Sequence, residues 1–116
     1  MRIGVTSQNF RTITGHAGKT RRFLIFERGA GANAPIEVDR WDLPKEMSLH
    51  EYRGEAPHPT TSLDVLVTGG CGDGFIRRMA AVNTRLVVTG ETDPATAVGA
   101  VLEDRPLPPP LTHEHG

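Results

Sequence analysis

The chain has 116 residues, a length that suits one domain with a single hydrophobic core. Its formal net charge of −1 provides no overall field that would attract nucleic acid or an acidic membrane. The sequence shows no apolar signal region at its start and no apolar run of membrane-spanning length, and its single cysteine, Cys71, excludes an intrachain disulfide. We therefore expect a cytoplasmic, loop-rich globular domain that binds neither nucleic acid nor membranes.

The first half of the chain predicts three strands joined by short connections. Arg2–Thr6 places its two aliphatic residues on one face of a short strand. The run R-F-L-I-F-E at Arg22–Glu27 is apolar on both faces, which is typical of an interior strand covered on both sides. Ile36–Asp39 alternates apolar and acidic residues, as a half-exposed edge strand does. These strands predict an antiparallel meander, and Pro44–Tyr52 then predicts one short helix with its proline in the first turn.

The second half predicts an alternation of strands and helices. Nearly continuous apolar runs make Leu63–Thr68 and Arg85–Thr89 two buried strands. A helix with apolar residues at helical spacing lies between them, and Asp93 followed by Pro94 predicts the N-cap and first residue of another. The predicted inner faces are Phe75, Ile76, Met79 and Ala80 in the first helix and Ala97, Val98, Val101 and Leu102 in the second. Strands and helices at these spacings predict parallel strands with right-handed crossovers.

Together these elements predict the fold class and the domain organisation. We expect an α/β fold with a mixed five-stranded sheet, in which an antiparallel meander is followed by a parallel βαβα half with helices on its faces. One domain would span residues 1–104. Residues 105–116, R-P-L-P-P-P-L-T-H-E-H-G, are rich in proline and predict a flexible tail, at most loosely docked.

The predicted topology also indicates where a ligand would bind. In open α/β sheets, ligands bind beyond the carboxyl ends of parallel strands, where successive connections leave in opposite directions. If the first strand lies beside Leu63–Thr68, the loop that carries His16 meets the loop that carries Cys71. Three cations follow the histidine closely, and they are Lys19, Arg21 and Arg22.

The residue types in these loops favour a soft metal inside an anionic shell. An imidazole and a thiolate, here those of His16 and Cys71, suit a soft metal ion. The amides of a glycine-rich loop at a helix N-terminus, with cations nearby, suit an anion. The glycines concerned are Gly69, Gly70 and Gly72. A metal–sulfur cluster or an oxothiomolybdate has both properties, and so few protein ligands would hold it openly and releasably, as a carrier does.

Three stretches of the sequence resemble one known family. M-R-I-G-V-T-S, H-A-G-K-T-R-R-F and L-D-V-L-V-T-G-G-C-G are similar, in this order, to the motifs of the dinitrogenase iron–molybdenum cofactor biosynthesis family, known from nitrogen fixation. The resemblance implies a ribonuclease H-like, three-layer fold and a non-enzymatic carrier of the iron–molybdenum cofactor or a related metal–sulfur cluster. Its implied partners are the proteins that donate and accept the cluster.

The resemblance also implies roles for individual residues. His16 matches the histidine of the family's loop, a candidate cluster ligand. Gly18 and Lys19 match the glycine and the cation that follow that histidine. Gly69, Gly70 and Gly72 match the family's glycine loop.

Two other function classes remain open on the sequence. The spacing from Cys71 to Arg77 is C-x5-R between a strand and a helix, which is the arrangement of cysteine phosphatases and arsenate reductases. A protein-interaction module that binds no metal is the second alternative. His113 and His115 could bind a transition metal weakly in an extended tail, and His50 and His58 are second-tier metal contacts at most.

Overall fold

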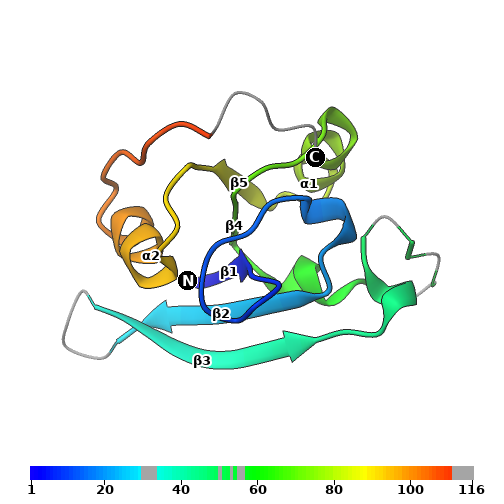
Figure 1. Ribbon diagram of the computed structural model, residues 1–116, viewed down its shortest axis with the longest axis horizontal. Helices are drawn as coiled ribbons and strands as arrows, with labels where there is room; N and C mark the ends of the chain where they lie inside the picture. Colours follow the sequence, from blue (N-terminus) through cyan, green and yellow to red (C-terminus); the bar gives the residue numbers. More distant parts are fainter. Residues whose placement is uncertain (30–33, 50, 53, 55–56, 111–116) are drawn as a thin grey trace.

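A five-stranded mixed sheet forms the centre of the molecule in the computed structural model, which describes residues 1–29, 34–49, 51–52, 54 and 57–110 (Figure 1). Its strands are β1 (Arg2–Thr6), β2 (Arg22–Arg28), β3 (Pro35–Asp42), β4 (Val65–Thr68) and β5 (Arg85–Val88). The spatial order is β3-β2-β1-β4-β5. The β1/β2 and β2/β3 pairs are antiparallel, whereas β1/β4 and β4/β5 are parallel. The predicted mixed sheet, with its meander and its parallel half, is confirmed.

Helices cover both faces of this sheet, because β2 sends apolar side chains to each side. Leu24 and Phe26 join a buried cluster that includes four side chains of α2 (Pro94–Leu102). Phe23 and Ile25 join a second cluster on the other face, which includes α1 (Asp73–Ala81) through Phe75 and Met79. Interior strands with two apolar faces require such a cover on each side. The molecule therefore has three layers, with α2 and α1 on opposite faces of the sheet (Figure 1).

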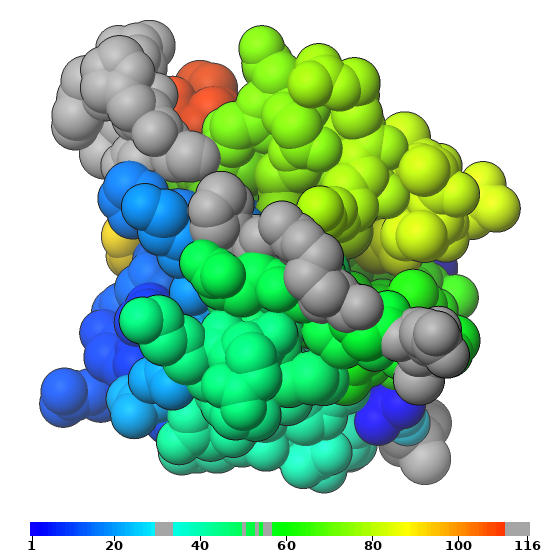
Figure 2. All heavy atoms as spheres, turned by 90° about the vertical axis from the view of Figure 1, so that its right-hand side faces the viewer, coloured from blue at the N-terminus to red at the C-terminus, as the bar shows by residue number. Residues whose placement is uncertain are grey.

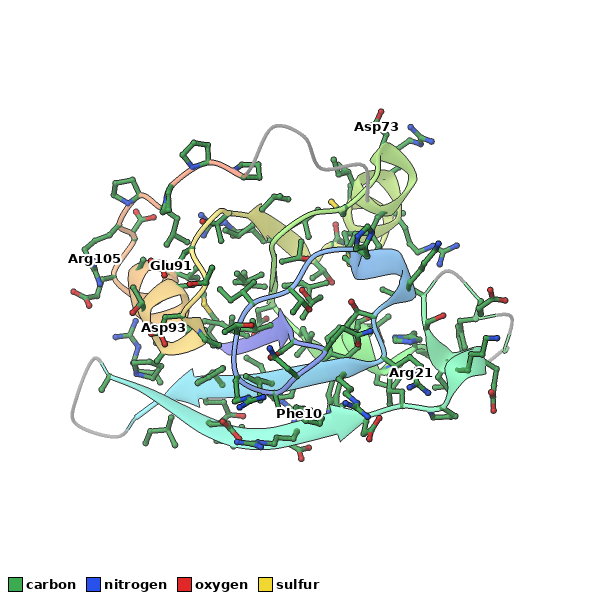
Figure 3. The ribbon with its side chains drawn as sticks, in the orientation of Figure 1. Phe10, Arg21, Asp73, Glu91, Asp93 and Arg105 are labelled. Atoms are coloured by element: carbon green, nitrogen blue, oxygen red, sulfur yellow. The ribbon has the colours of Figure 1, made fainter. Side chains whose placement is uncertain are left out.

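The N-terminus of α2 begins as the sequence predicts. Asp93 is the N-cap and its carboxylate accepts a hydrogen bond from the backbone amide of Thr96 at 2.9 Å, while Pro94 occupies the first turn. A side-chain acceptor at this position satisfies an amide that has no partner within the helix. Asp93 and Glu91 lie at the start of α2 in Figure 3.

The prediction that four residues of α1 face the core is wrong for two of them. Ile76 is 46% exposed and Ala80 is also exposed, whereas Phe75 and Met79 are buried. Phe75 and Met79 are four residues apart and share one face of the helix, which lies over β5 at the edge of the sheet. An edge strand offers a narrow surface, so only this stripe is buried.

The prediction that β5 is a buried strand is also wrong, because β5 lies at the edge of the sheet. The residues of β5 are half-buried or exposed, where the sequence predicts a buried strand, because one side of an edge strand has no neighbouring strand. At the other edge, β3 is largely exposed, as its alternating apolar and acidic residues predict.

The segment between β3 and β4 is less helical than predicted. Pro44–Tyr52 contains one 3-10 turn, η2 (Lys45–Met47), in place of a short helix. At Ser48 the backbone is already extended, with φ −63° and ψ 148°, so the turn stops after three residues. A second 3-10 turn, η3 (Pro59–Ser62), leads into Leu63, which is buried but precedes β4.

The first part of the proline-rich tail lies against the domain. The carbonyl oxygen of Pro108 accepts hydrogen bonds from the hydroxyl of Thr89 at 2.7 Å and from the amide of Gly90 at 3.3 Å. Leu107 packs against the cluster that α2 buries. A side chain at Gly90 would come within 2.7 Å of the carbonyl oxygen of Pro109, so this approach requires glycine. The tail residues 111–116, with His113 and His115, lie outside the described residues.

Candidate functional site

The two loops singled out in the sequence lie side by side at the carboxyl ends of β1 and β4. The amide of Ala17 donates to the carbonyl oxygen of Gly70 at 3.1 Å, and the amide of Gly69 donates to the carbonyl oxygen of Thr14 at 3.1 Å. His16 and Cys71 are therefore each one residue away from the hydrogen bond that joins Ala17 to Gly70. This is the meeting of loops that the parallel pairing of β1 and β4 predicts.

Buried threonines hold the two loops in place. The hydroxyl of Thr6, at the end of β1, donates to the carbonyl oxygen of Thr14 at 2.6 Å and lies 2.8 Å from the hydroxyl of Thr68, at the end of β4. Both threonines are fully buried. Because a buried hydroxyl that loses its partner is costly, these contacts fix both loops to the sheet.

His16 occupies a left-handed backbone conformation at the start of the 3-10 turn η1 (Ala17–Lys19). Its φ is 55° and its ψ is 49°, a region that favours glycine and, among other residues, asparagine, aspartate and histidine. The side chain is exposed and makes no hydrogen bond within the described part of the chain. Both ring nitrogens are therefore open to a ligand.

Cys71 is half-buried and lies against apolar side chains. It packs on the cluster that contains Ala17 and Phe23. Burial raises the pKa of the thiol, and the charge of Asp73 raises it further. The free thiol is therefore protonated at neutral pH, and a metal would have to displace its proton.

The glycine loop differs from the predicted anion cradle. The amide of Gly69 donates a hydrogen bond to the carbonyl oxygen of Thr14, and the amide of Gly70 donates one to the hydroxyl of Thr68 at 3.4 Å. Gly72 is the N-cap of α1, and the acidic side chain of Asp73 occupies the first turn of that helix. Because two amides are used internally and a carboxylate stands at the helix start, the loop is poorly suited to hold an anion.

The three predicted cations differ in their availability. Arg22 forms an ion pair with Asp42 at 3.3 Å, donates to the carbonyl oxygen of Gln8 at 3.0 Å, and lies 5.5 Å from the ring centre of Phe10. Arg22 is thus held by a carboxylate at the end of β3 and by the loop that follows β1. Lys19 and Arg21 form no ion pair within the residues that the structure describes. Gly18 is the middle residue of η1, between His16 and Lys19.

Lys19 and Arg21 line an open pocket of about 510 Å³ that the sequence did not reveal. Figure 3 shows Arg21 between the start of β2 and the segment that follows β3. The described lining residues are Lys19, Arg21, Lys45, Ser48 and Glu51. The last three of these residues lie in the segment for which the sequence predicts a short helix, and nothing in the sequence places that segment beside Lys19.

A smaller cavity lies where the loops after β1, β4 and β5 meet. Its volume is about 110 Å³, and its described lining residues are Ile13, Gly15, Gly69, Thr89, Gly90, Glu91 and Thr92. This volume holds a few water molecules at about 30 Å³ each. The carboxyl ends of the parallel strands therefore enclose little space, and the roomier site lies on the side of η1 and η2.

No group of three or more histidine, cysteine, aspartate or glutamate side chains that could hold a metal ion occurs among the described residues. His58 is buried, and its Nδ1 accepts from the amide of Thr60 at 3.1 Å while its Nε2 lies 2.5 Å from the carbonyl oxygen of Met47. Both ring nitrogens of His58 thus have structural partners. His50 lies outside the described residues. None of the described helices is long and apolar enough to cross a membrane.

Comparisons with known proteins show the fold alone. No family model and no curated protein matches the chain. Five solved chains match, among them the crystal structure of PH0822, with a TM-score of 0.68 over 90% of this chain and 93% of that one. The two sequences are 15% identical. The α/β architecture with its mixed sheet is therefore shared with a solved protein.

Proposed function

We propose that this protein binds and delivers an anionic metal–sulfur or molybdenum-containing cluster, or its precursor, with His16 as the leading ligand. The observation that carries the proposal is the exposed imidazole of His16, without a hydrogen-bond partner in the described structure and held at a left-handed backbone position. Glycine would adopt this conformation at lower cost, by about 1 kcal/mol. Phe10, Asn83 and Asp104 also have a positive φ, so the exposed, unpartnered imidazole carries the proposal and the backbone conformation only fixes its position.

The surroundings of His16 support a cargo that is both soft and negatively charged. Cys71 lies on the adjoining loop and is the second soft ligand. Lys19, on the same 3-10 turn, and Arg21 supply positive charge without ion-pair partners in the described residues. Two protein ligands would leave the remaining coordination positions to the sulfur or oxygen atoms of the cargo, which suits release to an acceptor protein.

The fold is consistent with the same proposal. We assign the strand order β3-β2-β1-β4-β5, with helices on both faces, to the ribonuclease H-like class. This assignment agrees with the resemblance to the dinitrogenase iron–molybdenum cofactor biosynthesis family that the motifs around His16 and Gly69–Gly72 carry. Donor and acceptor proteins of a cytoplasmic metallocofactor pathway would then be the partners.

Anaerobic reconstitution with iron, sulfide and molybdate tests the proposal, with visible absorption and bound metal as readouts. We expect His16→Gly to lose most of the bound metal while its thermal stability stays equal or rises by about 0.5–1 kcal/mol, because glycine relieves the left-handed backbone. His16→Asn is the matched control for backbone and size, since asparagine also tolerates this conformation. Wild-type protein that takes up no more metal than His16→Asn would contradict the carrier role.

Cys71 needs a separate pair of variants, because it also packs against the apolar cluster. Cys71→Ala keeps the packing volume approximately and removes the ligand, whereas Cys71→Ser keeps a weaker ligand atom. We expect both to lower metal uptake. Because the pKa of the thiol is raised, wild-type uptake should fall as the pH falls and the proton competes with the metal.

The cysteine phosphatase or arsenate reductase alternative has weaker support. Such enzymes attack through a thiolate, and here burial and Asp73 raise the pKa of Cys71. The amides of Gly69 and Gly70, which would hold the oxyanion, already have internal acceptors. Turnover of an aryl phosphate or arsenate that Cys71→Ser abolishes would favour the enzyme over the carrier.

A further inference from the structure

We infer that the pocket between η1, the start of β2 and η2 binds a tetrahedral oxyanion, as a free ion or as the terminal group of a small molecule. The pocket is lined by three cations, Lys19, Arg21 and Lys45, and by Ser48, whose side chain carries a hydroxyl. This inference does not depend on the proposed function, because it needs no metal and adds Lys45 and Ser48, which take no part in the carrier proposal.

The three cations come from separate segments of the chain and are uncommitted. Lys19 lies at the end of η1, Arg21 directly precedes β2, and Lys45 opens η2. None of them forms an ion pair or a side-chain hydrogen bond within the described part of the structure. Figure 2 shows the face on which the blue segment around η1 and the blue-green segment that follows β3 adjoin. The three side chains are therefore free to donate charge-assisted hydrogen bonds to an anion that enters the pocket.

Ser48 provides an independent observation that points to a ligand. The residue is 97% buried, yet its hydroxyl has no hydrogen-bond partner among the described residues. Among the described residues, two unpartnered side-chain atoms are fully enclosed, the Nε of Arg2 and the Oγ1 of Thr84. The hydroxyl oxygen of Ser48 is not one of them. The hydroxyl therefore keeps some contact with solvent, and Ser48 is one of the residues that line the pocket. A serine hydroxyl without an internal partner can donate a hydrogen bond to an oxyanion.

The backbone of η2 explains why Ser48 is presented in this way. Its amide donates to the carbonyl oxygen of Lys45 at 3.2 Å, and its carbonyl oxygen accepts from the amides of Glu51 at 3.0 Å and Tyr52 at 2.8 Å. The main chain of Ser48 is thus used on both sides, and only its side chain remains free. Lys45 and Ser48 are joined by the same hydrogen bond that closes the turn, so their spacing is set by η2.

The charge and the size of the pocket restrict its ligand. Glu51 is exposed and is the single carboxylate among the described lining residues, against three cations. A volume of about 510 Å³ falls within the range of about 300–1,000 Å³ that is typical of small-molecule sites. The pocket therefore has room for more than a single ion, and the cations favour a dianion such as phosphate, sulfate or molybdate over a monoanion.

Calorimetric titration of chelator-treated, full-length protein at low salt tests the inference, with inorganic phosphate and molybdate as free ions and adenosine monophosphate as a terminal phosphate. We expect Lys45→Gln and Arg21→Gln each to weaken phosphate binding about tenfold, because each removes a charge-assisted contact. Ser48→Ala should weaken it about five- to tenfold without any change in charge. Glu51→Gln should tighten it several-fold, because it removes the opposing carboxylate.

Arg85→Gln is the matched control, since it removes the same charge from β5 at the opposite edge of the sheet. Lys45→Arg should retain binding. Thermal melting establishes that each variant is folded, and the exposed Lys45 keeps the test decisive even where the buried Ser48→Ala variant fails to fold. Tighter binding of adenosine monophosphate than of phosphate assigns the site to a small molecule, and equal or weaker binding assigns it to the free ion. The inference is overturned if phosphate and molybdate do not bind, or if Arg85→Gln weakens binding as much as Lys45→Gln.

Discussion

At the scale of single residues, availability is decided by partners that lie far away in the sequence. Arg21 and Arg22 are neighbours, yet the guanidinium of Arg22 is held by Asp42 and Gln8, and that of Arg21 has no ion pair in the described residues. Side chains alternate along an extended chain, so neighbouring residues face different surroundings. The imidazole of His16 is exposed and has no hydrogen-bond partner within the described part of the chain, whereas that of His58 is buried with both nitrogens engaged.

His58 makes the stability of the protein depend on pH. Burial lowers the pKa of His58 below its ordinary value of 6.5, an effect that the hydrogen bond to Met47 opposes and the charge of Arg78 reinforces. The unfolded chain then takes up a proton near pH 6.5 that the folded chain does not, so this contribution to stability is complete above pH 6.5 and is lost as the pH falls toward the folded pKa.

Thermal melting of wild type and His58→Gln at pH 8 and at pH 5.5 measures this contribution. We expect the variant to be less stable at pH 8 by about 1–2 kcal/mol, since it loses hydrogen bonds to Thr60 and Met47. The difference between the two proteins should shrink at pH 5.5, because wild type alone has lost the histidine contribution. An equal difference at both pH values would contradict the role of His58.

At the scale of elements, local patterns predict where helices and strands lie better than which of their faces is buried. Two adjacent residues, Asp93 and Pro94, determine where α2 begins, because their preferences for the N-cap and the first turn act locally. The buried stripe of α1 and the half-exposure of β5 depend on the edge position of β5, which no local pattern contains. Local chemistry thus determines an element, and its neighbours determine its burial.

Removal of the cap should show how far α2 depends on it. Asp93→Ala removes the acceptor for the amide and hydroxyl of Thr96, at 2.9 and 2.6 Å, and should destabilise the protein by about 1 kcal/mol. Chemical denaturation measures the change. Asp93→Ser restores a capping oxygen without the charge and should recover most of the loss, whereas a serine variant as unstable as the alanine variant would show that the cap is not the cause.

At the scale of the whole molecule, the first part of the tail lies against the domain through Leu107 and Pro108. Leu107 packs on the apolar cluster under α2, and the carbonyl oxygen of Pro108 accepts two hydrogen bonds from Thr89 and Gly90, which follow β5. The sequence of this segment shows only its proline content, and its contacts with Thr89 and Gly90 follow from the way α2 returns the chain to the sheet.

Hydrogen exchange at single amides tests this attachment. Leu107→Ala should loosen the tail, so the amide of Gly90, whose acceptor is Pro108, should exchange faster. The amide of Leu66 in the interior strand β4 is the internal reference and should keep its protection. Unchanged exchange at Gly90 would show that the two hydrogen bonds hold the tail without Leu107.

The sequence by itself determined the number, type and order of most elements, the mixed topology of the sheet and the meeting of the His16 and Cys71 loops. These features follow from hydrophobic periodicity, capping residues and the handedness of parallel connections, which depend on residues close together in the sequence. Only the tertiary structure decided which polar groups are free. The amides of Gly69 and Gly70 have internal acceptors, and Arg22 forms an ion pair with Asp42. Lys45 and Ser48 line the same pocket as Lys19 and Arg21. The physical reason is that a polar group is available to a ligand only where folding brings it no internal partner, and those partners come from distant segments.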